Sequence, residues 1–132
     1  MSANIATSAL SAFTTQLVGF FEQLIMVFPE ERDVKNALEA IQGARKINPR
    51  LILDLFNSHI YNEFSEAIRQ ENLGFIQERA RLKIQKDFNE VMPALAIFDK
   101  HWATLSESNR RSIWNYLKVL CVLCEKARGA RF

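Results

Sequence analysis

The chain has 132 residues, a net charge of +2 and 48% hydrophobic residues, among them ten Phe and two Trp. This composition excludes a disordered tail, and the length suits one domain with a single core. Four Gly and three Pro are too few for a sandwich or barrel of many short strands, which needs frequent turns, so we expect an all-α fold.

The N-terminal region carries no sign of export. No Lys or Arg precedes Arg32, so the sequence lacks the basic region of a secretory signal and the arginines of a mitochondrial presequence. The most apolar run, residues 17–28, contains Glu22 and is shorter than the roughly twenty residues that cross a membrane. The two cysteines, Cys121 and Cys124, give no disulfide framework and favour a reducing compartment. We therefore expect a protein that is not secreted and has no membrane span.

The first predicted helix covers residues 8–28, after a flexible end over residues 1–7. Phe13, Phe20 and Phe21 share one broad apolar face with leucines at spacings of three and four. This face is either the side by which a central helix enters the core or, in part, a surface that binds another chain. The next residue, Pro29, is expected to end the helix, because proline has no backbone N–H and clashes with the preceding turn.

A second helix is expected to start at the cap Asp33. Asn48 and Pro49 are expected to end this helix and to begin a third one, which reaches about residue 70. Apolar residues recur every four positions from Ile52 to Ile68. In an α-helix of 3.6 residues per turn this spacing drifts by about 40° per step. We therefore expect a break near Asn57 and Ser58.

Residues 71–76 are interpreted as a connector in which Gly74 takes a positive φ. A long helix over residues 77–104 is expected to follow, and Pro93 to kink or split it. Ser106 is expected to cap the final helix, with Asn109 at its third position.

Together these elements predict one helical domain over residues 1–132, with residues 128–132 as a second flexible end. The fold class is all-α, a compact single-domain bundle of five to six helices. Its breaks are marked by three prolines, Pro29, Pro49 and Pro93.

The sequence holds no motif typical of a catalytic or metal site. Zinc needs four ligands of Cys or His type, and beyond the cysteine pair the chain offers only His59 and His101, neither at the spacing of a paired ligand. Cys121 and Cys124 lie deep in an apolar helix and are interpreted as core residues. The phosphate-binding and hydrolase motifs are absent from the sequence. We expect no enzyme activity, no cofactor, no metal and no small-molecule ligand.

Basic residues concentrate in the second half of the chain. Residues 1–66 contain five Lys or Arg against eight Asp or Glu, and residues 67–132 contain twelve against seven. Arg79, Lys83 and Lys86 share one face of a predicted helix. This face is either a solvated surface or the phosphate contact of a nucleic-acid-binding site.

A second basic pair, Arg110 and Arg111, lies in the first turn of the last helix, where positive charge opposes the helix dipole. This placement is unfavourable for the helix alone. We therefore expect an acidic partner for the pair, either inside the fold or on another molecule.

Four short motifs, taken together, resemble a known family. They are F-P-E-x-x-D-V at residues 28–34, N-P-R-L-I at 48–52, N-L-G-F-I at 72–76 and I-W-N-Y-L-K-x-L at 113–120. The combination is similar to that of a family of small, all-helical, uncharacterised proteins of nucleocytoplasmic large DNA viruses, the giant viruses. Glu71 stands where that family tends to have glycine. The resemblance implies a viral origin and a location in the virion or the infected host cell, in cytoplasm or nucleus, and it brings no catalytic residues.

These observations favour a non-enzymatic viral protein that acts through protein-protein contacts, as a virion or capsid-associated component or an assembly adaptor. Self-association or a protein partner would use the phenylalanine face of the first helix and the Arg110 and Arg111 pair. The alternative is a nucleic-acid-binding accessory factor in replication, transcription or packaging that uses the basic C-terminal half. An enzyme of unrecognised type is a third reading, and it requires a concave polar pocket.

Overall fold

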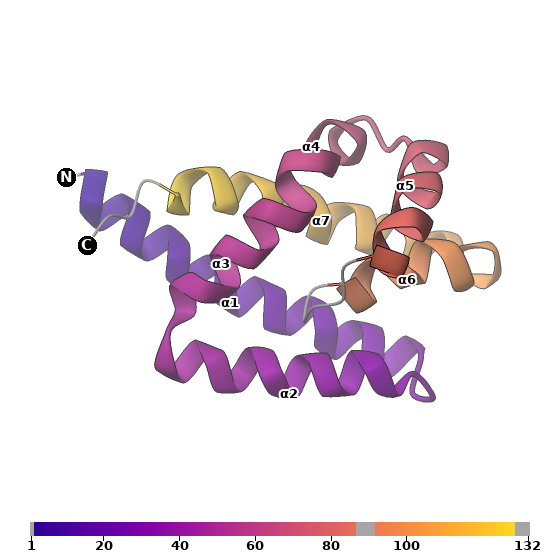
Figure 1. Ribbon diagram of the computed structural model, residues 1–132, viewed down its shortest axis with the longest axis horizontal. Coiled ribbons are helices and arrows are strands. Elements are labelled where there is room, and N and C mark those ends of the chain that lie inside the picture. Colours follow the sequence, from indigo (N-terminus) through magenta and orange to yellow (C-terminus); the bar gives the residue numbers. More distant parts are fainter. Residues whose placement is uncertain (1, 87–91, 129–132) are drawn as a thin grey trace.

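The computed structural model describes the backbone of residues 2–86 and 92–128, and the side chains of residues 7–83 and 96–128. Throughout that backbone the elements are helices joined by short turns (Figure 1), which confirms the all-α prediction. In chain order the elements are α1 (Ser2–Val27), α2 (Arg32–Ile47), α3 (Pro49–Phe56), η1 (Asn57–Tyr61), α4 (Asn62–Arg69), α5 (Leu73–Lys86), α6 (Met92–Lys100), η2 (Trp102–Thr104) and α7 (Glu107–Ala127). Of these, η1 is a π-helical segment and η2 is a 3-10 turn.

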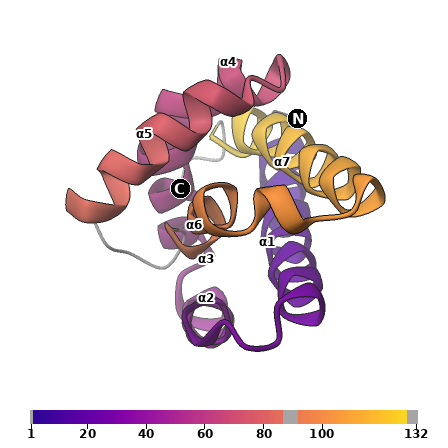
Figure 2. The same cartoon turned by 90° about the vertical axis from the view of Figure 1, so that its right-hand side faces the viewer.

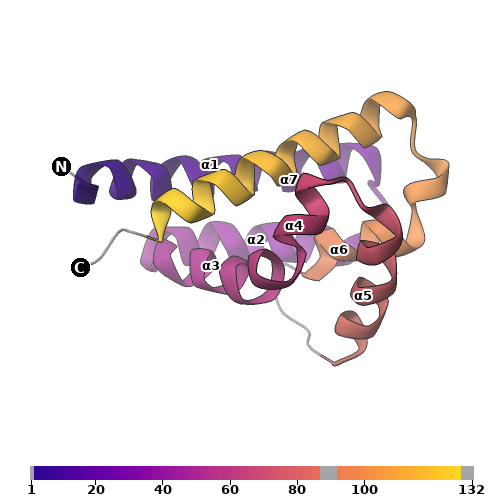
Figure 3. The ribbon, with the colours of Figure 1, turned by 90° about the horizontal axis from the view of Figure 1, so that it is seen from above.

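The central helix is α1, which begins at Ser2, so residues 2–7 continue the helix and do not precede it. It runs antiparallel to α7, and Figure 3 shows the two lying side by side. Both α2 and α3 also pack on α1, while α5 and α6 pack on each other to one side of the α1–α7 pair (Figure 2). By length and composition alone Thr7–Val27 could cross a membrane, a test that buried core helices of globular proteins also pass.

The prolines mark the helix boundaries as predicted. Pro29 lies in the turn between α1 and α2, and Pro49 is the first residue of α3, where its missing N–H costs no intrahelical bond. The long helix expected over residues 77–104 is split, because α5 ends at Lys86 and α6 begins at Met92, one residue before Pro93. The residues between these two helices lie outside the described part of the chain.

One predicted cap is confirmed and one is wrong. The N–H of Asn109 donates to the Ser106 hydroxyl oxygen at 3.1 Å, so Ser106 caps α7. The N-cap of α2 is Glu31, and Asp33 lies inside its first turn. A carboxylate there is still favoured by the helix dipole, which explains why Asp33 suits the start of this helix without capping it.

The break expected near Asn57 is a π-turn, in which the N–H of Asn62 donates to the carbonyl of Asn57, five residues back. A π-turn contains one residue more than an α-turn, so it absorbs the drift of a spacing of four. As a result the whole four-residue series enters the core, namely Ile52, Phe56, Ile60, Phe64 and Ile68.

The chain reverses after α4 through two backbone hydrogen bonds. The N–H of Glu71 donates to the Ile68 carbonyl at 3.1 Å, and the N–H of Asn72 donates to the Ala67 carbonyl at 2.8 Å. This pairing is the Schellman motif, in which the residue after the C-cap takes a left-handed conformation. That residue is Glu71, with φ 54°.

The predicted six-residue connector is therefore wrong. Because Glu71 makes the reversal, α5 already begins at Leu73, and Gly74 sits in its first turn without a positive φ. The Asn72 side chain accepts the Phe75 N–H at 3.2 Å and so satisfies one of the free donors at the start of α5.

Three aromatic rings fasten the corner between α6 and η2 to α7. Phe98 stacks on Trp102 with ring centroids 4.8 Å apart, and Trp114 meets these two rings at 5.5 Å and 5.4 Å. All three side chains are buried. The corner that carries His101 is thus held by the core.

Candidate protein-interaction surface

The phenylalanine face of α1 is the core of the protein and not a partner surface. Phe13 and Phe21 are 0% exposed and Phe20 is 2% exposed. Phe13 packs edge-on against Phe56 at 5.1 Å, and Phe20 lies 5.3 Å from the ring of Tyr116. The expectation that these residues bind another chain is wrong, because they are buried where α7, α2 and α3 pack on α1. The breadth of the face reflects a helix that is packed on several sides.

Arg79 and Lys83 of α5 are paired inside the fold. Lys83 lies 3.2 Å from the carboxylate of Glu63 on α4, and Arg79 lies 3.9 Å from the same group. Arg79 also stands over the ring of Phe75, 5.3 Å from its centroid. The side chain of Lys86 lies outside the described residues. Glu63 therefore neutralises part of the positive charge that Arg79 and Lys83 would need for a phosphate contact.

Arg110 finds its partner in the turn before α7. Its guanidinium donates to the carbonyl oxygens of Trp102 at 3.1 Å and Ala103 at 3.2 Å, and it lies 5.7 Å from the Trp102 ring centroid. The acceptor is thus a set of backbone carbonyls rather than the acid that we expected. Arg110 serves to hold η2 against α7.

Arg111 has the acidic partner that its position predicts; of the two locations left open the structure shows the one inside the fold, and the acid is Glu71. Arg111 donates to both carboxylate oxygens of Glu71, at 2.5 Å and 2.9 Å, and Lys118 adds a third bond at 2.6 Å. These bonds, led by those from Arg111, lower the pKa of Glu71 from 4.5 to about 2. One carboxylate therefore serves two cations, so the cluster keeps a net positive charge.

The cysteines are core residues, as predicted. Both are buried, and desolvation raises the pKa of Cys121 to about 12 and that of Cys124 to about 11. The Cys124 thiol also donates to the side-chain oxygen of Asn57 at 3.7 Å. Neither thiol is a nucleophile near neutral pH.

The outer face of α7 carries two neighbouring apolar side chains that are about half exposed. Val119 is 44% exposed and Val122 is 49% exposed, and residues three apart are neighbours on a helix surface. The other exposed large apolar side chains among the described residues lie singly on four elements: Met26, Ile47, Leu51 and Leu82. Within the part of the chain whose side chains are described, the valine pair is therefore the one apolar exposure that extends along a single helix face.

A groove borders each valine. Val122 lines a groove of about 300 Å³ between α7 and α4, together with Ile68 and Arg69. Val119 lines a shallower groove of about 360 Å³ between α7 and α1, together with Gln16. We call the outer face of α7 from Arg111 to Glu125, with its two grooves, the α7 ridge. Its shape offers apolar contact at the centre and polar contact on both flanks, which is typical of a helix-binding surface.

Charged side chains flank the valines of the α7 ridge, and its cations are paired inside the fold: Arg69 pairs with Glu66 at 2.9 Å, and Arg111 and Lys118 share the carboxylate of Glu71. The linings of the two grooves contain three cations, Arg69, Lys118 and Arg111, and one acid, Glu125. Glu125 is already engaged, because it accepts the hydroxyl of Tyr61. Sequence reasoning missed this surface because it treated the last helix as apolar over most of its circumference. The signal that could have found it is the placement of two valines on the side of α7 opposite its tryptophan and leucines.

No protein-family model, curated protein or solved structure matches the chain. The resemblance to the giant-virus family therefore stays a prediction.

Proposed function

We propose that the chain is a non-enzymatic viral helical protein that acts through protein-protein contacts, as a virion or capsid-associated component or an assembly adaptor. The observation that carries this proposal is the α7 ridge, where Val119 and Val122 stand exposed between two grooves. The burial of both thiols also supports it, and Arg110 is bonded to a backbone carbonyl of the fold. The viral part rests on the motif resemblance alone.

The partner that fits the α7 ridge is an amphipathic helix with acidic flanks. A row of apolar side chains at helical spacing can pack on the valines. Carboxylates beside that row would meet Arg111 and Lys118, two cations that share the single carboxylate of Glu71. Charge complementarity of this kind also sets the orientation of the partner.

Mass spectrometry of purified particles of the encoding virus, combined with sedimentation of the isolated protein, tests the proposal. We expect the chain in particles at a defined copy number, or a self-associated form in solution. A protein that stays strictly monomeric at high concentration and is absent from particles would contradict the proposal.

A nucleic-acid-binding accessory role is the rival proposal, and the basic surplus of residues 67–132 favours it. It predicts binding of duplex or single-stranded DNA that weakens steeply as salt rises, because phosphate contacts release counterions. Fluorescence anisotropy with a labelled DNA measures this. A negligible signal even at low salt removes the role.

A further inference from the structure

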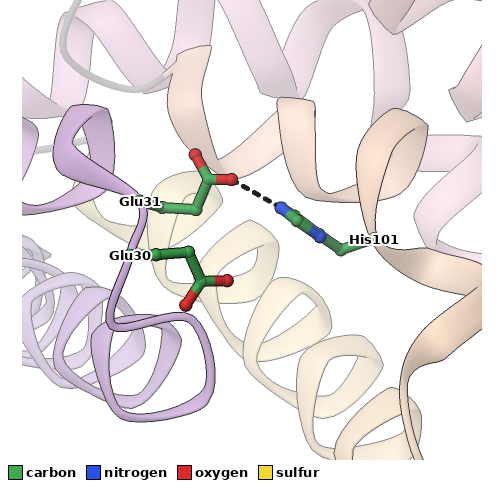
Figure 4. Close-up of side chains that lie close together, drawn as sticks. All are labelled: Glu30, Glu31 and His101. Atoms are coloured by element: carbon green, nitrogen blue, oxygen red, sulfur yellow. Dashed lines mark hydrogen bonds and ion pairs between the residues drawn. The ribbon is translucent and has the colours of Figure 1, made fainter.

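Two carboxylates and one imidazole meet on the side of the molecule where α2 approaches α6. Glu30 and Glu31 lie in the turn between α1 and α2, and His101 lies between α6 and η2 (Figure 4). One potential ligand atom from each residue lies within 4.8 Å of the others. No interaction on the α7 ridge uses these residues.

The imidazole and one carboxylate are held in place. The ring of His101 stacks on Phe28 with centroids 4.4 Å apart and an angle of 25°. Its Nε2 lies 2.6 Å from Oε1 of Glu31, and the two side chains are only 21% and 18% exposed. The backbone N–H of His101 is bonded to the Ile97 carbonyl at 3.0 Å, so the whole residue is anchored. Two of the three groups are therefore preorganised and partly shielded from water.

Glu30 is the adjustable member of the cluster. It is exposed, and Figure 4 shows its carboxylate turned away from His101. None of the hydrogen bonds or ion pairs recorded among the described side chains uses this carboxylate, so side-chain rotation can bring it in. Ligand atoms around a tetrahedral zinc ion with bonds of about 2.0 Å lie about 3.3 Å apart. Nε2 of His101 and Oε1 of Glu31 are now 2.6 Å apart, so they would have to separate by less than about 1 Å to hold such an ion.

Charge also suits a divalent cation. Two ionised carboxylates and a neutral imidazole balance a charge of +2. The imidazole proton then lies on Nδ1, so that the Nε2 lone pair faces the ion and the ion replaces the present hydrogen bond between Nε2 and Glu31. The present countercharge is Lys100, whose Nζ lies 3.4 Å from Oε1 of Glu31 and whose side chain is 59% exposed. A long, exposed lysine can leave without disturbing the core.

We propose that Glu30, Glu31 and His101 bind a divalent first-row transition-metal ion of the Zn²⁺ class, with water completing the coordination. The imidazole selects such ions over Mg²⁺ and Ca²⁺, which prefer oxygen ligands alone. The ion ties the α1–α2 turn to the corner between α6 and η2, two segments that lie seventy residues apart in the chain. It thereby stabilises the folded state by mass action.

The test is titration of the chelator-treated full chain with Zn²⁺ by calorimetry and with Co²⁺ by visible absorption. We expect one saturable site, a rise in the unfolding temperature with Zn²⁺, and cobalt d–d bands. The variants Glu30→Gln and His101→Phe should each lower the affinity for Zn²⁺ at least about tenfold. Even residues that only hydrogen-bond to a metal ligand typically contribute about that much, and a direct ligand should contribute no less. His101→Phe keeps a ring to stack on Phe28, and Glu30→Gln removes no contact of the fold, so both should remain folded.

Matched controls are His59→Phe and Glu39→Gln, which remove the same residue types elsewhere and should leave the affinity unchanged. The proposal is wrong if no saturable binding occurs, or if Glu30→Gln and His101→Phe bind as tightly as the native chain. A sulfur-to-cobalt charge-transfer band in the near ultraviolet would place the ion at Cys121 and Cys124 and would equally overturn it.

Discussion

At the scale of single residues, Glu71 combines an unfavourable backbone with favourable side-chain contacts. Its φ of 54° is a conformation that glycine adopts without cost and that other residues pay about 1 kcal/mol or more to hold. Its carboxylate in turn receives bonds from Arg111 and Lys118. Glu71 thus closes α4 and fastens α7 to it, two roles that glycine at this position could not combine.

The first prediction concerns the pH dependence of this cluster. The pKa of Glu71 falls from 4.5 to about 2 on folding, so its ionised form stabilises the fold above about pH 4.5. That contribution is lost as the pH falls through about 2. Because solvent screens the cluster, we expect Glu71→Gln to lower the free energy of unfolding by about 1 kcal/mol at neutral pH.

Urea unfolding of both proteins, followed by circular dichroism, measures the difference. The gap between native chain and Glu71→Gln should close as the pH falls from about 4.5 towards 2. A gap of the same size at all pH values would show that the ion pairs do not stabilise the fold.

The second prediction separates the backbone cost from the ion pairs. Glu71→Ala and Glu71→Gly both remove the carboxylate, but only glycine fits the left-handed conformation without strain. We expect Glu71→Gly to be about 1 kcal/mol more stable than Glu71→Ala in the same unfolding assay. Equal stabilities would mean that the reversal tolerates a Cβ and that the positive φ carries no cost.

At the scale of elements, the π-turn η1 reconciles the sequence of α3 and α4 with the core. The five apolar residues spaced by four positions all enter one core only because one extra residue is accommodated between Phe56 and Asn62. Ser58 is exposed within that turn. The extra residue of η1 therefore acts as a length correction, because it offsets the rotation that a four-residue spacing accumulates along an α-helix.

The third prediction follows from this role. Deletion of Ser58 should convert η1 into an ordinary α-turn, keep Phe64 and Ile68 facing the core, and leave a cooperatively folded protein. Deletion of Glu66, an exposed residue within α4, should instead rotate Ile68 by about 100° away from the core. We expect a loss of about 3 kcal/mol or more for that deletion. Thermal unfolding of the two variants compares them, and equal losses would contradict the length-correction account.

At the scale of the whole molecule, the sequence predicts the helices and their breaks better than the surfaces. Pro29, Pro49, Pro93 and Ser106 act within one turn of the chain, so their effects could be read locally. The pairing of Glu71 with Arg111 spans forty residues, and that of Glu31 with His101 spans seventy. Contacts at such separations depend on how the helices pack, which periodicity does not reveal.

The same limit explains the error at the phenylalanines. Periodicity shows that Phe13, Phe20 and Phe21 share a face, but not whether the same chain or another covers it. Here the same chain buries them, where α7, α2 and α3 pack on α1. The exposed valine pair, Val119 and Val122, lies instead on the far side of α7, where it interrupts a polar stripe. The candidate interaction surface is therefore a property of the packed molecule.

The central claim is that the α7 ridge is the contact surface for a helical partner with acidic flanks. A photoreactive residue at Val122, carried by the chain in particles or infected cells, tests it most directly. Leu82 on α5, which is 54% exposed and isolated, is the matched control position. The account predicts a crosslink from position 122 to one acidic amphipathic segment, lost on Val119→Asp, and none to that segment from position 82. Equal crosslinking from both positions, or none from position 122, would contradict it.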